Sequence, residues 1–104
     1  MKFVFALLLS LGVMAAGNVA ASDQTKLAQS SGCMTCHAID KKLIGPGYKE
    51  IAAKYRNDKG AEANLVKKVK AGGSGVWGSI PMPPNAHVKE DNIKAIVHWV
   101  LELK

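Results

Sequence analysis

Cys33-Met34-Thr35-Cys36-His37 is the stretch that decides how this chain folds. Two thiols three residues apart, followed directly by an imidazole, are the pattern of covalent c-type haem attachment. On a helical turn, residues three and four apart lie on one face, so both sulfurs and the imidazole can address one flat group. Each thiol would add to a haem vinyl group as a thioether, and His37 would ligate the iron. The segment therefore predicts one haem c, attached by two thioether bonds.

Other uses of a Cys-x-x-Cys pair must be weighed against haem. A thioredoxin-like redox couple is expected beside a βαβ pattern, and the chain has no strand-like alternation of apolar residues. A zinc site needs four ligands; His87 and His98 could complete the set, but their spacing from Cys33 and Cys36 is unusual. A short disulfide is a third alternative. Because a histidine follows the second cysteine directly, we favour haem.

The first 22 residues are predicted to be a signal peptide. Lys2 precedes an apolar run, and small residues follow it up to Ser22, with cleavage after Ala21 or after Ser22. The run is shorter than the roughly 20 apolar residues that a spanning helix needs. We therefore expect export to the periplasm, no stable membrane insertion, and one mature domain over residues 23–104.

Composition narrows the class of this domain further. Both cysteines lie in the opening pentapeptide, which excludes a disulfide framework, so a buried prosthetic group would supply the core that so small a domain needs. The formal net charge is +6, a balance that suits nucleic acid, an anionic membrane or an acidic protein. Export disfavours nucleic acid, and we expect an acidic protein partner; for any individual lysine, a solvated surface position that only aids solubility is the alternative.

Apolar periodicity predicts an all-α domain of about four helices. The expected helices cover residues 23–31, 48–56, 61–70 and 89–104. Residues 38–47 and the glycine- and proline-rich residues 72–84 are expected to be loops, and the second loop is long enough to be functional. On the last helix, Trp99 is expected to pack in the core and His98 to be a surface or satisfied histidine.

A haem iron held by one histidine leaves a sixth position, and its occupant decides between electron transfer and catalysis. Met34 lies inside the pentapeptide and cannot reach the opposite face. Met82 stands between Pro81 and Pro83, an unusual place for a flexible residue that only fills space. We therefore favour Met82 as the second ligand, with His87 as the competing one.

Four segments taken together resemble the small bacterial class I monohaem cytochromes of the cytochrome c-551/c-552 family. They are the pentapeptide, Gly45-Pro46-Gly47-Tyr48, Gly75-Val76-Trp77-Gly78 and Pro81-Met82-Pro83-Pro84-Asn85, in that order. The resemblance covers essentially all of residues 23–104. It implies the class I cytochrome c fold, with about four helices around one covalently bound haem, and a periplasmic role in respiratory electron transport.

The resemblance also assigns roles to individual residues. Cys33 and Cys36 would carry the thioether bonds, and His37 and Met82 would be the two axial ligands of the iron. The Pro46 carbonyl would accept a hydrogen bond from the His37 ring, which orients the ring and tunes its donor strength.

Three further residues would contact the haem or its ligand. Trp77 would donate its indole N–H to a haem propionate, and Asn85 would lie near the Met82 sulfur. Lys68 stands where some relatives have an arginine that also meets the propionate, but a lysine offers a point charge instead of a planar fork.

The predicted function is one-electron transfer without catalysis. Upstream, the partner would be a quinol-oxidising complex, and downstream a terminal reductase or oxidase, each periplasmic or membrane-bound. Lys41, Lys42, Lys67 and Lys68 would steer encounter with an acidic patch on such a partner, and a monomer is expected. The alternative is a peroxidase-like enzyme or gas sensor, which requires a labile sixth ligand.

Overall fold

The computed structural model describes residues 22–104 of the chain. Apart from Ser22, the segment that the sequence predicts as a signal peptide lies outside these residues, so that expectation stays a prediction. Within the described part, no helix is long and apolar enough to cross a membrane.

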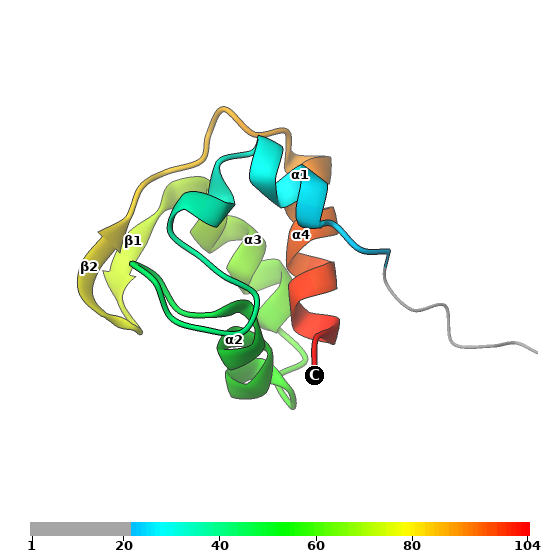
Figure 1. Cartoon of the computed structure of the whole chain (residues 1–104), viewed down its shortest axis with the longest axis vertical. Coiled ribbons are helices and arrows are strands. Elements are labelled where there is room, and N and C mark those ends of the chain that lie inside the picture. Colours follow the sequence, from blue (N-terminus) through cyan, green and yellow to red (C-terminus); the bar gives the residue numbers. More distant parts are fainter. Residues whose placement is uncertain (1–21) are drawn as a thin grey trace, which may run out of the picture.

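Within residues 22–104, four α-helices are the main elements of regular structure, as the apolar periodicity predicts (Figure 1). Their bounds are α1 Thr25–Ser30, α2 Tyr48–Tyr55, α3 Ala61–Ala71 and α4 Glu90–Glu102. Between α1 and α2, a short 3-10 turn, η1, covers Cys33–Thr35. The two cysteines therefore lie on or beside a helical turn, which is the arrangement that the pentapeptide requires.

Local chemistry explains where the first and last helices begin. The Asp23 carboxylate accepts hydrogen bonds from the Thr25 backbone N–H and hydroxyl, so α1 starts two residues later than predicted. At α4, the Lys89 side chain makes no capping hydrogen bond. Glu90 and Asp91 occupy the first turn of α4 instead, where negative charge interacts favourably with the helix dipole.

The segment predicted as a loop over residues 72–84 contains a small antiparallel hairpin, which corrects that expectation. β1 spans Gly73–Gly75 and β2 spans Gly78–Met82, with Gly73 opposite Met82. Every residue of the two strands is exposed except the half-buried Met82, so no alternation of apolar and polar residues marks them. Pro81 is tolerated because both strands of a two-stranded sheet are edge strands.

Helix α4 is the centre of the core and packs against α1, α2 and α3. One buried cluster joins it to α1 and α2, and a second joins it to α3. Their buried members are Ala28, Tyr48, Ile96, Trp99 and Val100 in the first, and Val66, Ile93 and Val97 in the second. Trp99 is buried and meets the Tyr48 ring edge-on, with centroids 5.7 Å apart, as its predicted core role requires.

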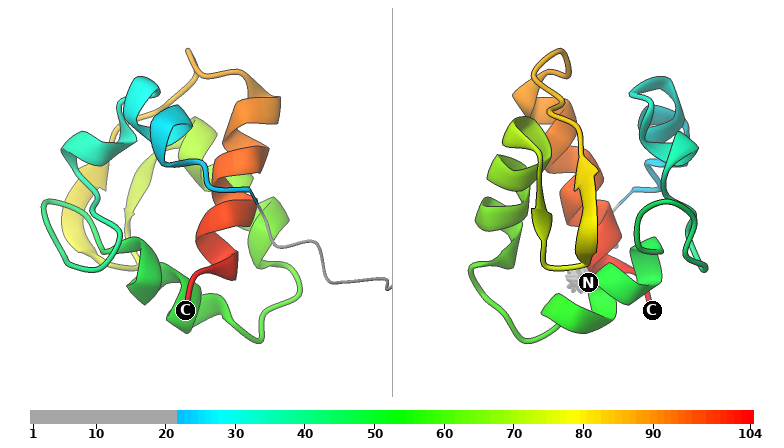
Figure 2. Two further views of the ribbon diagram at one scale, coloured as in Figure 1. Left: turned by 45° about the vertical axis from the view of Figure 1, so that its right-hand side comes forward. Right: turned by 90° about the vertical axis from the view of Figure 1, so that its left-hand side faces the viewer.

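Two groups of elements face each other around this core. In the right-hand view of Figure 2, α3, α4 and the hairpin form one side of the molecule. The chain from α1 through η1 and residues 38–47 forms the other side, and α2 lies below both. The residues that line the main pocket come from both groups.

Candidate haem site

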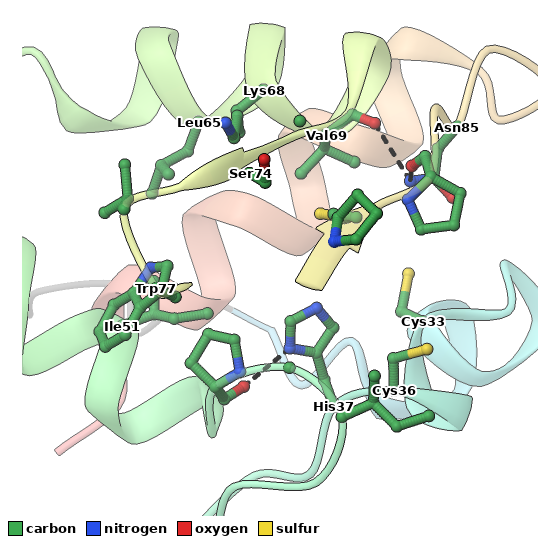
Figure 3. A pocket seen from close by; sticks show the side chains of 18 of the residues that line it. Cys33, Cys36, His37, Ile51, Leu65, Lys68, Val69, Ser74, Trp77 and Asn85 are labelled. Carbon is green, nitrogen blue, oxygen red and sulfur yellow. Dashed lines mark hydrogen bonds between the residues drawn. The ribbon is translucent and has the colours of Figure 1, made fainter. Parts of the chain in front are cut away.

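The main pocket brings together every residue that the sequence proposes for the haem site. It contains about 1180 Å³ of empty space, counted with its open mouth, and its walls are mostly apolar. The predicted residues on its lining are Cys33, Cys36, His37, Pro46, Lys68, Trp77, Met82 and Asn85. Figure 3 shows the cysteines and His37 along one side of the pocket, with Leu65, Val69 and Asn85 along the other.

The two histidines considered as alternative ligands lie elsewhere. His87 is exposed and is not part of the pocket lining. His98 is on the surface, where its Nδ1 lies 3.1 Å from Glu62 Oε1, linking α4 to α3. Within residues 22–104, no three His, Cys, Asp or Glu side chains gather as a metal site would require. The structure therefore gives the zinc interpretation no support.

His37 is held with one ring nitrogen available to the pocket. His37 is 8% exposed, and its Nδ1 lies 2.7 Å from the Pro46 carbonyl oxygen. Since a carbonyl oxygen only accepts, Nδ1 carries the proton and donates it in this bond. In the neutral ring, the other nitrogen, Nε2, then keeps its lone pair, and this is the form in which imidazole binds a metal.

The surroundings of the His37 ring fix its position as well as its tautomer. The ring stacks on Tyr48, with centroids 5.2 Å apart and planes 25° apart. The backbone of Gly45 also comes so close to the ring that an added Cβ would lie 2.7 Å from His37 Cε1. The sequence places Gly45 only in a loop and Tyr48 only on a helix. Their contacts with His37 arise from how residues 38–47 wrap around the ring.

Both cysteines carry free, half-buried thiols on the same pocket wall. Burial raises the pKa of the Cys33 thiol, although a hydrogen bond with Tyr48 acts in the opposite sense. The pKa of Tyr48 is raised too, by burial first and then by the neighbouring Cys33. The Cys33 thiol and the Tyr48 hydroxyl are thus both uncharged at neutral pH.

The opposite wall carries Met82, which is half-buried at the end of β2. Asn85 follows three residues later, and its Nδ2 donates to the carbonyl oxygens of Val69 and Pro83, each at 3.1 Å. The Trp77 ring is partly exposed at the pocket mouth, with Lys54 Nζ 5.6 Å from its centroid. The contact between α2 and the hairpin through Lys54 has no signal in the sequence.

Comparison with known proteins identifies this arrangement. The family model for cytochrome c matches residues 22–104, the whole of the described chain. The chain belongs to the cytochrome c family. The resemblance drawn from its motifs is thereby confirmed, as is the fold class.

The similarity extends to individual cytochromes c and to a solved structure. The chain is 57% identical to cytochrome c-551 of Allochromatium vinosum over 77 residues, covering 74% of this chain and 82% of that one. It is 47% identical to cytochrome c-551 of Pseudomonas aeruginosa, covering 93% and 92%. The crystal structure of wild-type Nitrosomonas europaea cytochrome c552 matches with a TM-score of 0.74 and 47% identity, over 76% of this chain and 98% of that one.

Membership of this family implies one covalently attached haem c and a role as an electron carrier. The residues of this cytochrome c fit such a group. The pocket walls are apolar, and the imidazole tautomer leaves one nitrogen for a metal. Gly45 leaves the ring the room that a side chain would fill. The two free thiols lie on the same wall as the imidazole.

Proposed function

We propose that this cytochrome c is exported to the periplasm and carries single electrons between respiratory redox proteins, with His37 and Met82 as the axial ligands of its haem iron. One observation carries the proposal: both side chains line the same pocket, from elements on its two sides. The chain segment around His37 and strand β2, which ends at Met82, face each other in Figure 2.

His37 would bind the iron through Nε2. Its Nδ1–H donates to Pro46, and such a bond orients a metal-binding ring and raises its basicity. Cys33 and Cys36 lie on the same wall and would hold the haem there through two thioether bonds. Attachment and first ligand then come from one short segment.

Met82 would supply the second ligand from the opposite wall. Its thioether lines the pocket, whereas His87 is exposed and outside it. When bound, the haem supplies a reversible one-electron change at its iron. With protein ligands on both sides, no position is left for a substrate, which supports a carrier and not an enzyme. The apolar walls and the soft thioether both favour the less charged reduced state and so raise the reduction potential.

Contact with a redox partner would occur at the pocket mouth. Ile44, Val76 and Ile80 are exposed there, and Lys42 lines a second hollow together with Ile44 and Ile80. The lysines would steer an acidic partner toward this apolar rim, and the contact itself would be small. Turnover with the partner should therefore slow as ionic strength rises, and a rate independent of salt would contradict this part of the proposal.

Met82→Ala tests the ligand assignment, with Met34→Ala as the matched control. Met34 packs against the core cluster and is not part of the pocket lining. We expect Met82→Ala to keep its haem, bind carbon monoxide readily when reduced and show a lowered reduction potential, while Met34→Ala behaves like the native protein. An unchanged spectrum in Met82→Ala would point to His87 as the ligand. Ready binding of carbon monoxide by the native reduced protein would favour the haem enzyme or gas sensor.

A further inference from the structure

The end of α3 meets the segment Met82–Asn85, here called the distal arm, at Gly72. Gly72 follows the last residue of α3 and has φ 72° and ψ −168°, a conformation that is essentially restricted to glycine. A Cβ at this position would lie 2.5 Å from Met82 O, 2.8 Å from Pro84 N and 2.9 Å from Pro83 C. These are backbone atoms, which no rotamer change can move aside.

Asn85 holds the same arm against α3 from its far end. Its backbone N–H donates to Val69 O at 3.1 Å and to Lys70 O at 3.2 Å. Its side-chain Nδ2 also donates to Val69 O, the bond drawn as a dashed line in Figure 3. These bonds satisfy carbonyl groups in the last turn of α3, which lack partners within the helix. The distal arm is therefore held against α3 by the contact at Gly72 and by the hydrogen bonds of Asn85.

The distal arm is too stiff to absorb a displacement at this contact. The proline rings of Pro83 and Pro84 lock φ at both positions. The middle of the arm therefore has little freedom to rotate away from the contact. A push on Met82 O and Pro83 C would thus move the Met82 backbone as a unit, and with it the side chain that lines the pocket.

We propose that Gly72 is a positioning residue for Met82. Because Gly72 has no side chain, the distal arm can pack closely against the end of α3, and this packing determines how far the Met82 thioether reaches into the pocket. The inference rests on the proposed function, in which Met82 ligates the iron. It adds a residue on a different element, ten positions earlier in the chain, that decides whether the ligand reaches its place.

Gly72→Ala in the haem-loaded protein tests the inference, with Gly32→Ala as the matched control. Gly32 also has a positive φ, 84°, but a Cβ added there would meet nothing within 4 Å, and the residue is not part of the pocket lining. Both variants therefore place alanine where the backbone disfavours it, and only Gly72→Ala pushes on the arm. The readout is the affinity of the ferric protein for imidazole, which competes with Met82 for the iron.

We expect Gly72→Ala to bind imidazole about ten-fold more tightly than the native protein, the factor that corresponds to a modest overpacking strain. Gly32→Ala should stay within about two-fold of the native affinity, because its methyl group meets no neighbour and lies outside the pocket. Equal affinities in the two variants would overturn the positioning role. Met82→Ala separates this role from the ligand assignment. If the affinity for imidazole is unchanged in Met82→Ala as well as in Gly72→Ala, the ligand assignment itself fails. If only Met82→Ala binds imidazole more tightly, the ligand assignment stands and the role of Gly72 is refuted.

If Gly72→Ala does not accumulate with haem, amide hydrogen exchange of the native protein decides. Saturating imidazole displaces Met82 and should loosen the contacts between the distal arm and α3. The Asn85 N–H should therefore exchange at least several-fold faster. The Gly45 N–H, which donates to Cys36 O at 2.7 Å on the other wall, should be unaffected. Unchanged exchange at Asn85 would show that the arm's seat on α3 and the place of Met82 are independent, and would overturn the proposal.

Discussion

His37 and Met82 lie on opposite walls of the pocket. The residues that hold His37 are close to it in the sequence, whereas those that hold the segment around Met82 lie on a separate helix. His37 hydrogen-bonds to Pro46 and stacks on Tyr48, so its partners lie within eleven positions of it. The distal arm that carries Met82 depends on α3, through Gly72 and the bonds of Asn85. The first wall is set by local chain geometry, whereas the second exists only once separate elements have packed. Variants that damage one wall and spare the other test this difference.

The largest effect is expected from removing both proposed attachment sites on the His37 wall. Cys33→Ala combined with Cys36→Ala leaves no thiol to form a thioether bond, so no haem should remain bound after acid-acetone extraction. The domain should also lose most of its stability, because the pocket loses the group that fills it. A haem stain of the denatured protein measures attachment, and Met34→Ala, within the same pentapeptide, should retain full staining. Haem that survives extraction from the double variant would contradict the attachment.

A smaller effect is expected when the backbone beside the imidazole gains a methyl group. The Cβ of Gly45→Ala would lie 2.7 Å from His37 Cε1, and overpacking of this kind costs about 1–3 kcal/mol. Gly60→Ala is the control, because its Cβ would meet only ordinary contacts at 3.5 Å and beyond. Denaturant unfolding of the two haem-loaded variants measures the difference in free energy. Equal stability would mean that the ring is not confined as tightly as the structure indicates.

On the distal wall, Asn85→Ala should cost less than the change at Gly45. It removes two side-chain hydrogen bonds to Val69 and Pro83, each contributing about 0.5–1.5 kcal/mol. The bond to Pro83 is exposed to solvent and contributes at the lower end of this range, so we expect a total loss of about 1–2 kcal/mol. Asn64→Ala, at an exposed site on α3, should lose less than about 0.5 kcal/mol. A loss at Asn85 no larger than at Asn64 would show that the side chain does not latch the arm.

The smallest effect concerns α1, which leads into the His37 wall. Hydrogen bonds from Thr25 lower the pKa of the Asp23 carboxyl below its ordinary value. A depressed folded pKa means that this contribution is fully present above the unfolded pKa and is lost as pH falls below about 4, through the folded value. We expect the Thr25 amide to lose protection from hydrogen exchange in that window. Asp23→Asn should show no such pH dependence, and identical pH profiles would contradict the assignment.

The same division explains how far the sequence predicts the structure. The pentapeptide and the breaker residues Gly45-Pro46-Gly47 predict the His37 wall, because the determinants of a local turn are adjacent in the chain. The four helices follow from apolar periodicity. The hairpin β1–β2 escapes prediction because its strands are exposed and carry no alternating pattern.

The distal wall is predicted only in part. Met82 is identifiable because prolines flank it and no other suitable thioether remains. In the sequence, Gly72 looks like an ordinary glycine at the end of a helix. Its proposed role depends on contacts with backbone atoms ten and more positions away, which the sequence does not reveal. A contact of this kind becomes visible only when the elements are placed in space. The sequence therefore points to the proposed ligands more readily than to the residue proposed to position one of them.

Whether His37 and Met82 hold the haem iron from opposite sides can be read from the proton NMR spectrum of the reduced protein. A methyl group held over the face of a haem experiences the ring current, which shifts its resonance far upfield. We expect one strongly shifted methyl signal that is assigned to Met82, is absent in Met82→Ala and persists in Met34→Ala. A reduced native protein without such a signal, or one whose shifted methyl belongs to another residue, would contradict this ligation.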